Sequence, residues 1–184
     1  MYRTLMAATW FILAATTVFQ VRILPDMYVN SFRIREFVNT REAIWVYKTS
    51  TRSRVRCKFD KMRSIQPTFI VFNRTLLYSG QRTSVEMRGI FSLRNTNRMY
   101  TMHAGQLIGI ESLYFKALDS SCAVIVVHSF TERGTVYVDL RIRNSAVRAG
   151  PTATCTREFS RFARHGGSVI YSPNCSQELR NALM

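Results

Sequence analysis

Residues 68–93 read TFIVFNRTLLYSGQRTSVEMRGIFSL, and this stretch decides the fold class. It holds two runs rich in apolar and β-branched residues, Thr68–Tyr78 and Val85–Leu93, with Ser79-Gly80 between them. Runs of this kind, bounded by turn residues, are typical of β-strands. Similar runs are Ile44–Tyr47, Val55–Ile65, Met99–Met102, Leu113–Leu118, Ala123–Val127 and Thr135–Ile142. Eight short strands at this spacing predict an all-β sandwich or barrel.

The hydrophobic pattern changes on both sides of this strand region. Apolar residues between Met27 and Asn39 do not alternate strictly, which predicts a short N-terminal helix. Further on, Cys155, Phe159 and Phe162 share one face of a predicted C-terminal α-helix, which Gly166-Gly167 is expected to end. A last short strand is expected over 168–172. An eight-stranded barrel of this size is wide enough to hold one small ligand.

The N-terminus has the layout of a secretory signal peptide. Arg3 supplies a positive charge, Leu5–Phe19 is apolar, and small residues occupy 14–17. The apolar run is short for a membrane span, and the alternative is a buried N-terminal helix. We therefore predict a signal peptide at 1–20 and a single secreted, extracellular domain at 21–184.

Four cysteines follow the predicted signal peptide: Cys57, Cys122, Cys155 and Cys175. None forms a C-x-x-C pair, so a zinc site is not expected. An even number of cysteines in a secreted chain predicts two disulfides, and the sequence alone allows three pairings. Asn73 and Asn174 begin glycosylation sequons.

The chain is strongly basic, with 26 Lys and Arg against 11 Asp and Glu and a formal charge of +15. This favours anionic partners such as heparan-type polysaccharide, acidic phospholipid or an anionic ligand. Two basic stripes are either solvated faces or docking surfaces: Arg52, Arg54, Arg56 and Lys58, and Arg157, Arg161 and Arg164. We find no interleaved aromatics of the kind that single-stranded nucleic acid requires, so a nucleic-acid partner is not expected.

Catalysis has little support in the sequence. His103, His128 and His165 are isolated, and the chain contains no nucleophile elbow, P-loop or dinucleotide-binding motif. We therefore expect a monomeric binding protein without catalytic residues, metal or cofactor.

Short segments spread over residues 37–175 form an ordered set around the cysteines. They are Asn39–Trp45, Val55–Cys57, Thr68–Asn73, Ser121–Val124, Tyr137–Ser145, Phe159 and Val169–Ser172. This set resembles the tick salivary lipocalins, the family that includes the histamine-binding proteins. The resemblance implies an eight-stranded antiparallel lipocalin barrel. It also implies that Cys122 pairs with Cys155, and Cys57 with Cys175.

Amine binders of that family carry an acid after one cysteine and a Glu-Leu-aromatic motif before the next. Here Ala123 replaces the acid and Arg141 replaces the aromatic residue, whereas Asp139 keeps a carboxylate. A cationic amine needs carboxylate counter-ions because a buried unpaired charge is costly. These departures work against an amine at that position, while Glu42 and Trp45 preserve a second part of the family pattern.

The candidate ligand-binding residues are Glu42, Trp45, Tyr100, Tyr114, Asp139 and Arg141. Glu42 either faces a ligand amine or is a solvated loop charge, and Trp45 either lines the pocket or closes the barrel base. Asp139 and Arg141 share one strand face, where they either pair with each other or form a polar pocket wall. The two tyrosines are pocket aromatics or ordinary core residues.

Two functions are consistent with these observations. The first is capture of a small host mediator, either histamine or another biogenic amine, as the family implies, or a fatty-acid-type lipid whose carboxylate pairs with Arg141. The second is a cationic module that binds heparan-type polysaccharide, platelets or a host protein through its surface. An open lumen favours the first function, and strongly salt-dependent binding favours the second.

Overall fold

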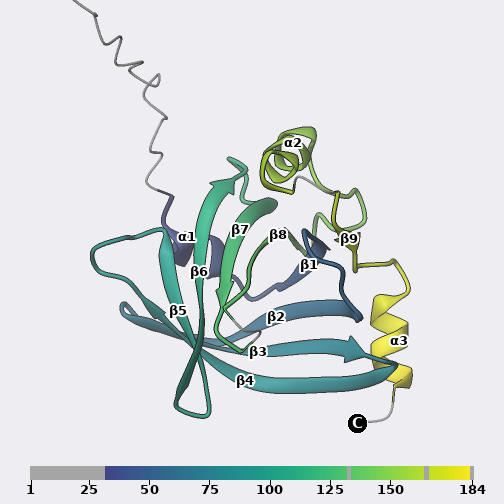
Figure 1. Ribbon diagram of the computed structural model, residues 1–184, viewed down its shortest axis with the longest axis horizontal. Coiled ribbons are helices and arrows are strands. Elements are labelled where there is room, and N and C mark those ends of the chain that lie inside the picture. The colour runs from purple at the N-terminus through teal and green to yellow at the C-terminus, as the bar shows by residue number, and fades with distance from the viewer. Residues whose placement is uncertain (1–31, 132–133, 164–165, 183–184) are drawn as a thin grey trace, which may run out of the picture.

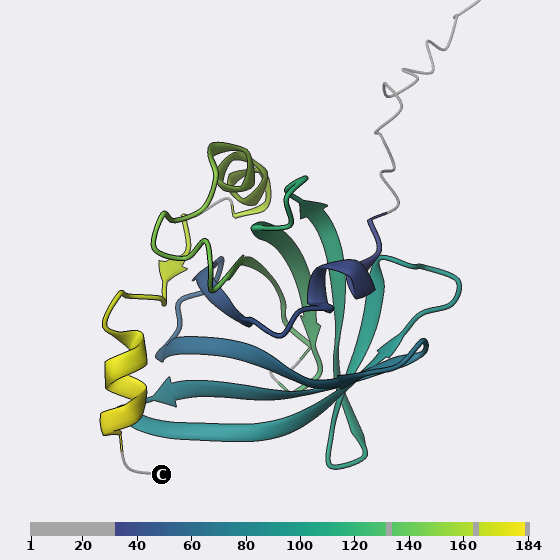
Figure 2. The ribbon, with the colours of Figure 1, turned by 180° about the vertical axis from the view of Figure 1, so that it is seen from behind.

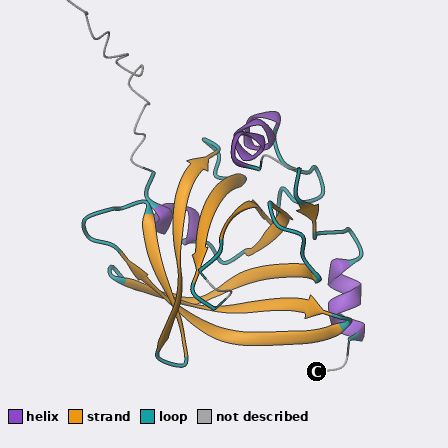
Figure 3. Ribbon diagram, in the orientation of Figure 1, coloured by secondary structure: helices purple, strands orange, loops and turns teal. Residues whose placement is uncertain are grey.

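The computed structural model describes residues 32–131, 134–163 and 166–182. The predicted signal peptide, residues 1–20, lies outside these ranges. Within them the chain forms one antiparallel sheet that curls into a barrel, with helices around it (Figures 1 and 3).

The barrel is built from eight consecutive strands. They are β1 (Ala43–Thr49), β2 (Val55–Ile65), β3 (Phe69–Tyr78), β4 (Gln81–Phe91), β5 (Arg98–His103), β6 (Gln106–Lys116), β7 (Cys122–Ser129) and β8 (Val136–Arg143). Each strand pairs with the next, β8 pairs with β1, and β1 pairs with β2, which closes the barrel. The predicted eight-stranded antiparallel barrel is confirmed.

The predicted strand boundaries agree closely with the structure at β2 and β3. β2 coincides with the predicted run, and the tight turn at Ser79 and Gly80 has the positive φ angles, 50° and 83°, of a type I′ hairpin. β4 begins at Gln81 rather than at 85, and β6 at Gln106 rather than at 113. The first residues of β4 are mostly exposed and polar, so the apolar pattern does not mark them, whereas the first residues of β6 include the apolar Leu107, Ile108 and Ile110, which the predicted run omits.

Both predicted helices are present. Helix α1 (Ile34–Val38) lies beside the connection between β4 and β5, where Ile34 N–H donates to Thr96 O (Figure 2). Helix α2 (Ala153–Phe162) begins after Thr152, whose hydroxyl accepts a hydrogen bond from Cys155 N–H. It ends at Phe162, before the predicted terminus at Gly166-Gly167.

Two short elements complete the chain. Strand β9 (Ser168–Val169) pairs with β1, and it is shorter than the predicted 168–172. Helix α3 (Cys175–Asn181), which the sequence analysis did not predict, stands beside the ends of β2, β3 and β4 (Figures 1 and 2). Seven residues are too few to show helical periodicity in the sequence.

Two hydrophobic cores lie on opposite faces of the barrel wall. The lumen core contains α1 residues and inward-facing strand residues, among them Phe37, Phe72, Met99 and Ile125. The outer core lies between the wall and the C-terminal segment, where Leu140 and Phe159 pack together with both disulfides. The barrel is therefore packed on both faces along β1, β7 and β8.

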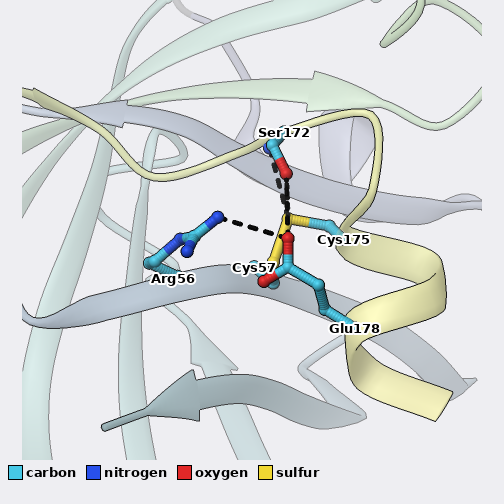
Figure 4. Close-up of a disulfide and its surroundings, with 5 residues drawn as sticks. All are labelled: Arg56, Cys57, Ser172, Cys175 and Glu178. Atoms are coloured by element: carbon cyan, nitrogen blue, oxygen red, sulfur yellow. Dashed lines mark hydrogen bonds and ion pairs between the residues drawn. A yellow bond between two sulfur atoms is a disulfide. The ribbon is translucent and has the colours of Figure 1, made fainter. Parts of the chain in front are cut away.

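Both disulfide pairings implied by the resemblance are confirmed. Cys122 is bonded to Cys155, which ties β7 to α2, and Cys57 is bonded to Cys175, which ties β2 to α3. Figure 4 shows the second bridge, with the Arg56–Glu178 ion pair of 3.2 Å beside it. The bridges anchor the C-terminal segment to the outside of the barrel.

Candidate functional site in the barrel lumen

The lumen-facing side chains change from apolar to polar along several strands. From the closed end outward they are Met62, Asp60 and Lys58 in β2; Ile70, Phe72 and Arg74 in β3; Ile125, Val127 and Ser129 in β7; and Arg141, Asp139 and Tyr137 in β8. Since residues two apart in a strand share a face, this pattern divides the lumen into an apolar closed half and a polar open half.

The closed half is filled by side chains. A cavity of only about 20 Å³ remains beside Glu42, Ile44 and Asp60, which is room for about one water molecule. The Glu42 carboxylate accepts a hydrogen bond of 2.7 Å from Ser145 N–H, and hydrogen bonding by the side chain and the backbone of Ser145 lowers the pKa of Glu42. Glu42 therefore borders a space too small for an amine ligand and is already hydrogen-bonded.

Six charged side chains form a layer between the two halves, here called the charged layer. Its members are Lys58, Asp60, Arg74, Glu111, Asp139 and Arg141. Arg141 lies 2.6 Å from Glu111, and Arg74 lies 2.8 Å from the same carboxylate. Arg74 also makes two hydrogen bonds with Asp60, of 2.8 and 2.7 Å. Three carboxylates thus compensate three cations within the barrel.

The pKa values of the layer follow from burial and pairing. Burial alone would raise the pKa of the Glu111 carboxyl, but the guanidiniums of Arg141 and Arg74 lower it far below its ordinary value. Burial lowers the pKa of the Lys58 ammonium, and the charge of Asp139 offsets this only in part. Burial and Asp139 together raise the pKa of the Tyr137 hydroxyl. Of the two buried charges of Glu111 and Lys58, that of Lys58 is therefore the less well compensated by its neighbours.

The open half contains a cavity of about 630 Å³ above the charged layer. Its floor includes Lys58, Arg74, Glu111 and Asp139, and its wall carries apolar side chains beside hydroxyl groups. The wall and rim include Thr49, Arg52, Arg54, Leu76, Thr101, Val127, Ser129 and Tyr137. A volume of this size suits a small organic ligand.

Hydrogen-bonding capacity is left over on the cavity floor. The Oδ1 atom of Asp139 is buried and has no hydrogen-bond partner among the described residues. The other oxygen, Oδ2, lies 3.4 Å from Arg141 and 3.7 Å from Lys58. Asp139 therefore offers an acceptor to a ligand in the cavity.

The structure places Asp139 and Arg141 together on the lumen face of β8, as the alternation predicted. The sequence allowed either an ion pair or a polar pocket wall, and both interpretations hold in part. Asp139 and Arg141 form an ion pair. Asp139 also lines the open cavity, and Arg141 lines the small cavity in the closed half. Arg141 is buried among the carboxylates of Glu111, Asp139 and Asp60.

The three candidate aromatic residues line neither of these two cavities. Trp45 packs in the outer core against Phe59, and its indole N–H donates to Asn144. Tyr114 is exposed and contacts Phe162 of α2 at 4.2 Å between ring centroids. Tyr100 lies between Met99 and Thr101, which are buried on the opposite face of β5. Their position on the outward phase of each strand excludes them from the lumen.

The interpretation of the first basic stripe as one solvated face is wrong. A bulge at Cys57, where φ is 52°, interrupts the alternation of β2, so that Lys58 points into the lumen. Arg52 and Arg54 lie at the cavity rim, and Arg56 pairs with Glu178. In the second stripe, Arg157 and Arg161 both contact Glu158, and Arg164 lies outside the described residues.

Four members of the charged layer were not among the sequence candidates: Lys58, Asp60, Arg74 and Glu111. Arg74 follows the buried Phe72 by two positions, and Asp60 precedes the partly buried Met62 by two positions, so each shares the phase of an inward-facing apolar residue. That phase is a sequence signal for an inward-facing charge. Lys58 is in phase with Asp60 and Met62, but the bulge at Cys57 separates it from the face of Arg56, to which the sequence pattern assigned it.

The two glycosylation candidates differ in exposure. Asn174 is exposed just before α3, whereas Asn73 is half-buried within β3, paired on both sides. Use of either sequon remains a prediction.

No helix among the described residues is long and apolar enough to cross a membrane. No group of three or more His, Cys, Asp or Glu side chains among them is arranged to hold a metal ion.

Comparison with known proteins identifies structural relatives. No protein-family model and no curated protein sequence matches the chain. The solved structures it is similar to include AM182 in complex with serotonin, at a TM-score of 0.61 and 18% identity over 79% of this chain and 93% of that one. They also include the siderocalin Ex-FABP, at 0.58 and 11% identity over 74% and 95% of the two chains.

A third similar structure is Japanin from Rhipicephalus appendiculatus bound to cholesterol, at a TM-score of 0.49 and 6% identity over 65% of this chain and 85% of that one. We base the assignment on the first two structures. Together with the closed eight-stranded barrel and the helix that follows it, they show that this chain has the lipocalin fold.

Proposed function

We propose that the chain is a secreted salivary lipocalin, of the tick family that its sequence resembles, which sequesters a small host mediator. The observation that carries this proposal is the cavity of about 630 Å³ in the open half of the barrel. Capture in a largely desolvated cavity lowers the free concentration of the mediator and so suppresses inflammation or haemostasis. This action requires no reaction, and the proposal is a carrier rather than an enzyme.

The floor of the cavity favours a ligand that carries a hydrogen-bond donor with positive charge. Asp139 Oδ1 is a buried carboxylate oxygen without a partner among the described residues, and an ammonium group would satisfy it. The neighbouring structure of AM182 contains serotonin, which is a ligand of this kind. We therefore take a biogenic amine such as histamine or serotonin as the first ligand class, with its amine at Asp139.

A fatty-acid-type mediator is the second ligand class. The proposed pairing of its carboxylate with Arg141 has little room, since Arg141 is 3% exposed and in contact with three carboxylates. Lys58 and the rim residues Arg52 and Arg54 are the cations that the open cavity presents instead. A lipid acid would therefore bind through these three residues.

The cationic surface module remains the alternative function. Exposed arginines support it, but several are already paired: Arg56 with Glu178, and Arg157 and Arg161 with Glu158. Binding of heparin would then fall steeply with added salt, whereas ligand capture in the lumen would change little.

Native mass spectrometry of the mature protein tests the proposal. We expect a saturable one-to-one complex with at least one of histamine, serotonin, a leukotriene and arachidonate. A complex with the amines would make Asp139 the leading counter-ion of the ligand. A complex with the lipids alone would give that role to Lys58 and the rim arginines. Failure of all four to bind, together with salt-sensitive heparin binding, would contradict capture and support the surface function.

A further inference from the structure

The charged layer is neutral as a whole. Its three carboxylates and three cations are all at most 12% exposed, and each makes at least one ion pair with another member. A ligand that brings one net charge to this floor should therefore bind less tightly than a ligand that brings both charges, because its charge is not compensated in a partly desolvated site.

The floor also leaves one acceptor and one donor incompletely used, and they belong to neighbouring residues. Asp139 Oδ1 has no hydrogen-bond partner among the described residues. The Lys58 ammonium makes a single ion pair within those residues, at 3.7 Å to Asp139 Oδ2, which exceeds hydrogen-bonding distance. Both side chains line the open cavity.

The surroundings of Lys58 show that its charge needs a further partner. Its closest carboxylate, Asp139, is shared with Arg141, and its ammonium lies 5.9 Å from the centre of the Tyr137 ring. Burial lowers the pKa of Lys58 despite the attraction of Asp139. An incoming carboxylate would complete the hydrogen bonds that the ammonium lacks.

We infer that the open cavity selects a zwitterionic head group of the α-amino-acid type, with its ammonium on Asp139 Oδ1 and its carboxylate on Lys58 Nζ. Such a head group carries both charges on one carbon, so they stand side by side as the two side chains do. The apolar part of the ligand would lie against Leu76, Val127 and Tyr137 on the cavity wall. This inference rests on the proposed function, because it needs the lumen to be the binding site.

Three probes that share an indole ring separate the contributions of the head group. Tryptophan carries both charges, tryptamine carries only the ammonium, and indole-3-propionate carries only the carboxylate. By isothermal titration of the mature protein, we expect tryptophan to bind more tightly than either of the others by about tenfold, the effect of one additional hydrogen bond to a charged group.

Two substitutions assign the two charges to the two residues. Lys58→Met should weaken tryptophan and indole-3-propionate by about tenfold, because the variant removes the donor to their carboxylate. It should not weaken tryptamine, because the variant leaves the floor with one more negative than positive charge, which a lone ammonium compensates. Asp139→Asn should weaken tryptophan and tryptamine instead. Lys61→Met is the matched control, because Lys61 lies on the same strand but is exposed, and it should change none of the three affinities.

The outcomes distinguish this inference from the proposed function. Tighter binding of tryptamine than of tryptophan, or unchanged tryptophan binding in Lys58→Met, would overturn the zwitterion inference and leave capture in the lumen intact. Absence of binding by all three probes, and by the mediators named above, would overturn both. If Asp139→Asn fails to fold, Lys58→Met still decides the test. The Lys58→Met variant keeps the ion pair between Arg141 and Asp139, so its charged layer loses only one cation.

Discussion

The Arg141 guanidinium lies 2.6 Å from the Glu111 carboxylate inside the barrel, where the two side chains are 3% and 1% exposed. The pair joins β8 to β6 across the lumen, and Arg74 of β3 completes it from a third strand. This contact separates the packed half of the lumen from the open one. It therefore sets both the depth of the cavity and the polarity of its floor.

Removal of the Glu111 charge should destabilise the protein strongly. In Glu111→Gln, two buried guanidiniums lose their shared carboxylate, and breaking a buried pair in this way costs about 3–5 kcal/mol. The measurement is the free energy of unfolding in denaturant. Glu86→Gln is the control, since Glu86 is exposed on β4 and its substitution should cost less than about 0.5 kcal/mol. Equal effects of the two substitutions would contradict the role of the charged layer.

The same carboxylate should make stability depend on acid. Burial acts to raise the pKa of Glu111, but Arg141 and Arg74 outweigh it and hold this pKa far below the ordinary value of 4.5. The unfolded chain therefore binds this proton more readily than the folded one below that value. The contribution of Glu111 is present above pH 4.5 and is lost as the pH falls further. Between about pH 5 and pH 3, the free energy of unfolding should fall more steeply in the wild type than in Glu111→Gln; parallel curves would exclude this linkage.

The disulfide that closes the longer loop should contribute more to stability, with a logarithmic dependence on loop length. Their sequence separations are 118 residues for Cys57–Cys175 and 33 for Cys122–Cys155. By chain entropy, their removal should cost about 5 and about 4 kcal/mol respectively. Paired Cys→Ala variants, compared in denaturant, measure each contribution. A stability unchanged after loss of either bridge would show that the bridge constrains nothing in the unfolded chain.

Gly167 is required where β9 approaches β1. Its φ is 66°, and a Cβ atom there would lie against the carbonyl oxygen of Thr49. Gly166 also has a positive φ, 81°, but a Cβ atom there would meet no atom within 4 Å. Gly166→Ala should therefore cost only the backbone strain, about 1 kcal/mol, whereas Gly167→Ala should cost more. Thermal unfolding of the two variants gives the difference, and equal melting temperatures would argue against the close approach.

Trp45 should matter for stability but not for ligand binding. Its indole packs between Phe59 and Tyr171 in the outer core and donates to Asn144 Oδ1 at 2.9 Å. Trp45→Phe removes this hydrogen bond and part of the packing, which should cost about 1–3 kcal/mol. Affinity for any lumen ligand, measured by titration, should be unchanged. A loss of affinity without a loss of stability would instead place Trp45 at the ligand.

The barrel and its disulfides could be predicted from the sequence because apolar alternation and cysteine spacing are local or family-wide signals. The β3–β4 hairpin is marked by its turn residues, and β2 has the predicted bounds. The polar start of β4 and helix α3 carry no comparable apolar pattern. They are fixed by pairing with a neighbouring strand and by the Cys57–Cys175 bridge.

The site could be predicted only in part. The alternation of β8 correctly placed Asp139 and Arg141 on one face, and the structure shows that this face lines the lumen. It could not reveal their partners, because Glu111 is 30 residues from Arg141 in the sequence, and Lys58 and Asp60 come from β2, still farther away. Trp45 and Tyr114 were candidates by residue type, but the phase of their strands directs them to the outer core and to α2. The bulge at Cys57 turns Lys58 inward, and strict alternation does not anticipate it.

Occlusion of the open cavity tests the central claim most directly. Leu76 lines this cavity, and Leu76→Trp should fill part of it, while Ser64→Trp places the same side chain at an exposed position on β2. The measurement is native mass spectrometry of both variants and the wild type with histamine, serotonin, a leukotriene and arachidonate. The account predicts a one-to-one complex that persists in Ser64→Trp and is lost or greatly weakened in Leu76→Trp. Equal binding by all three proteins would contradict a ligand site in the open half of the barrel.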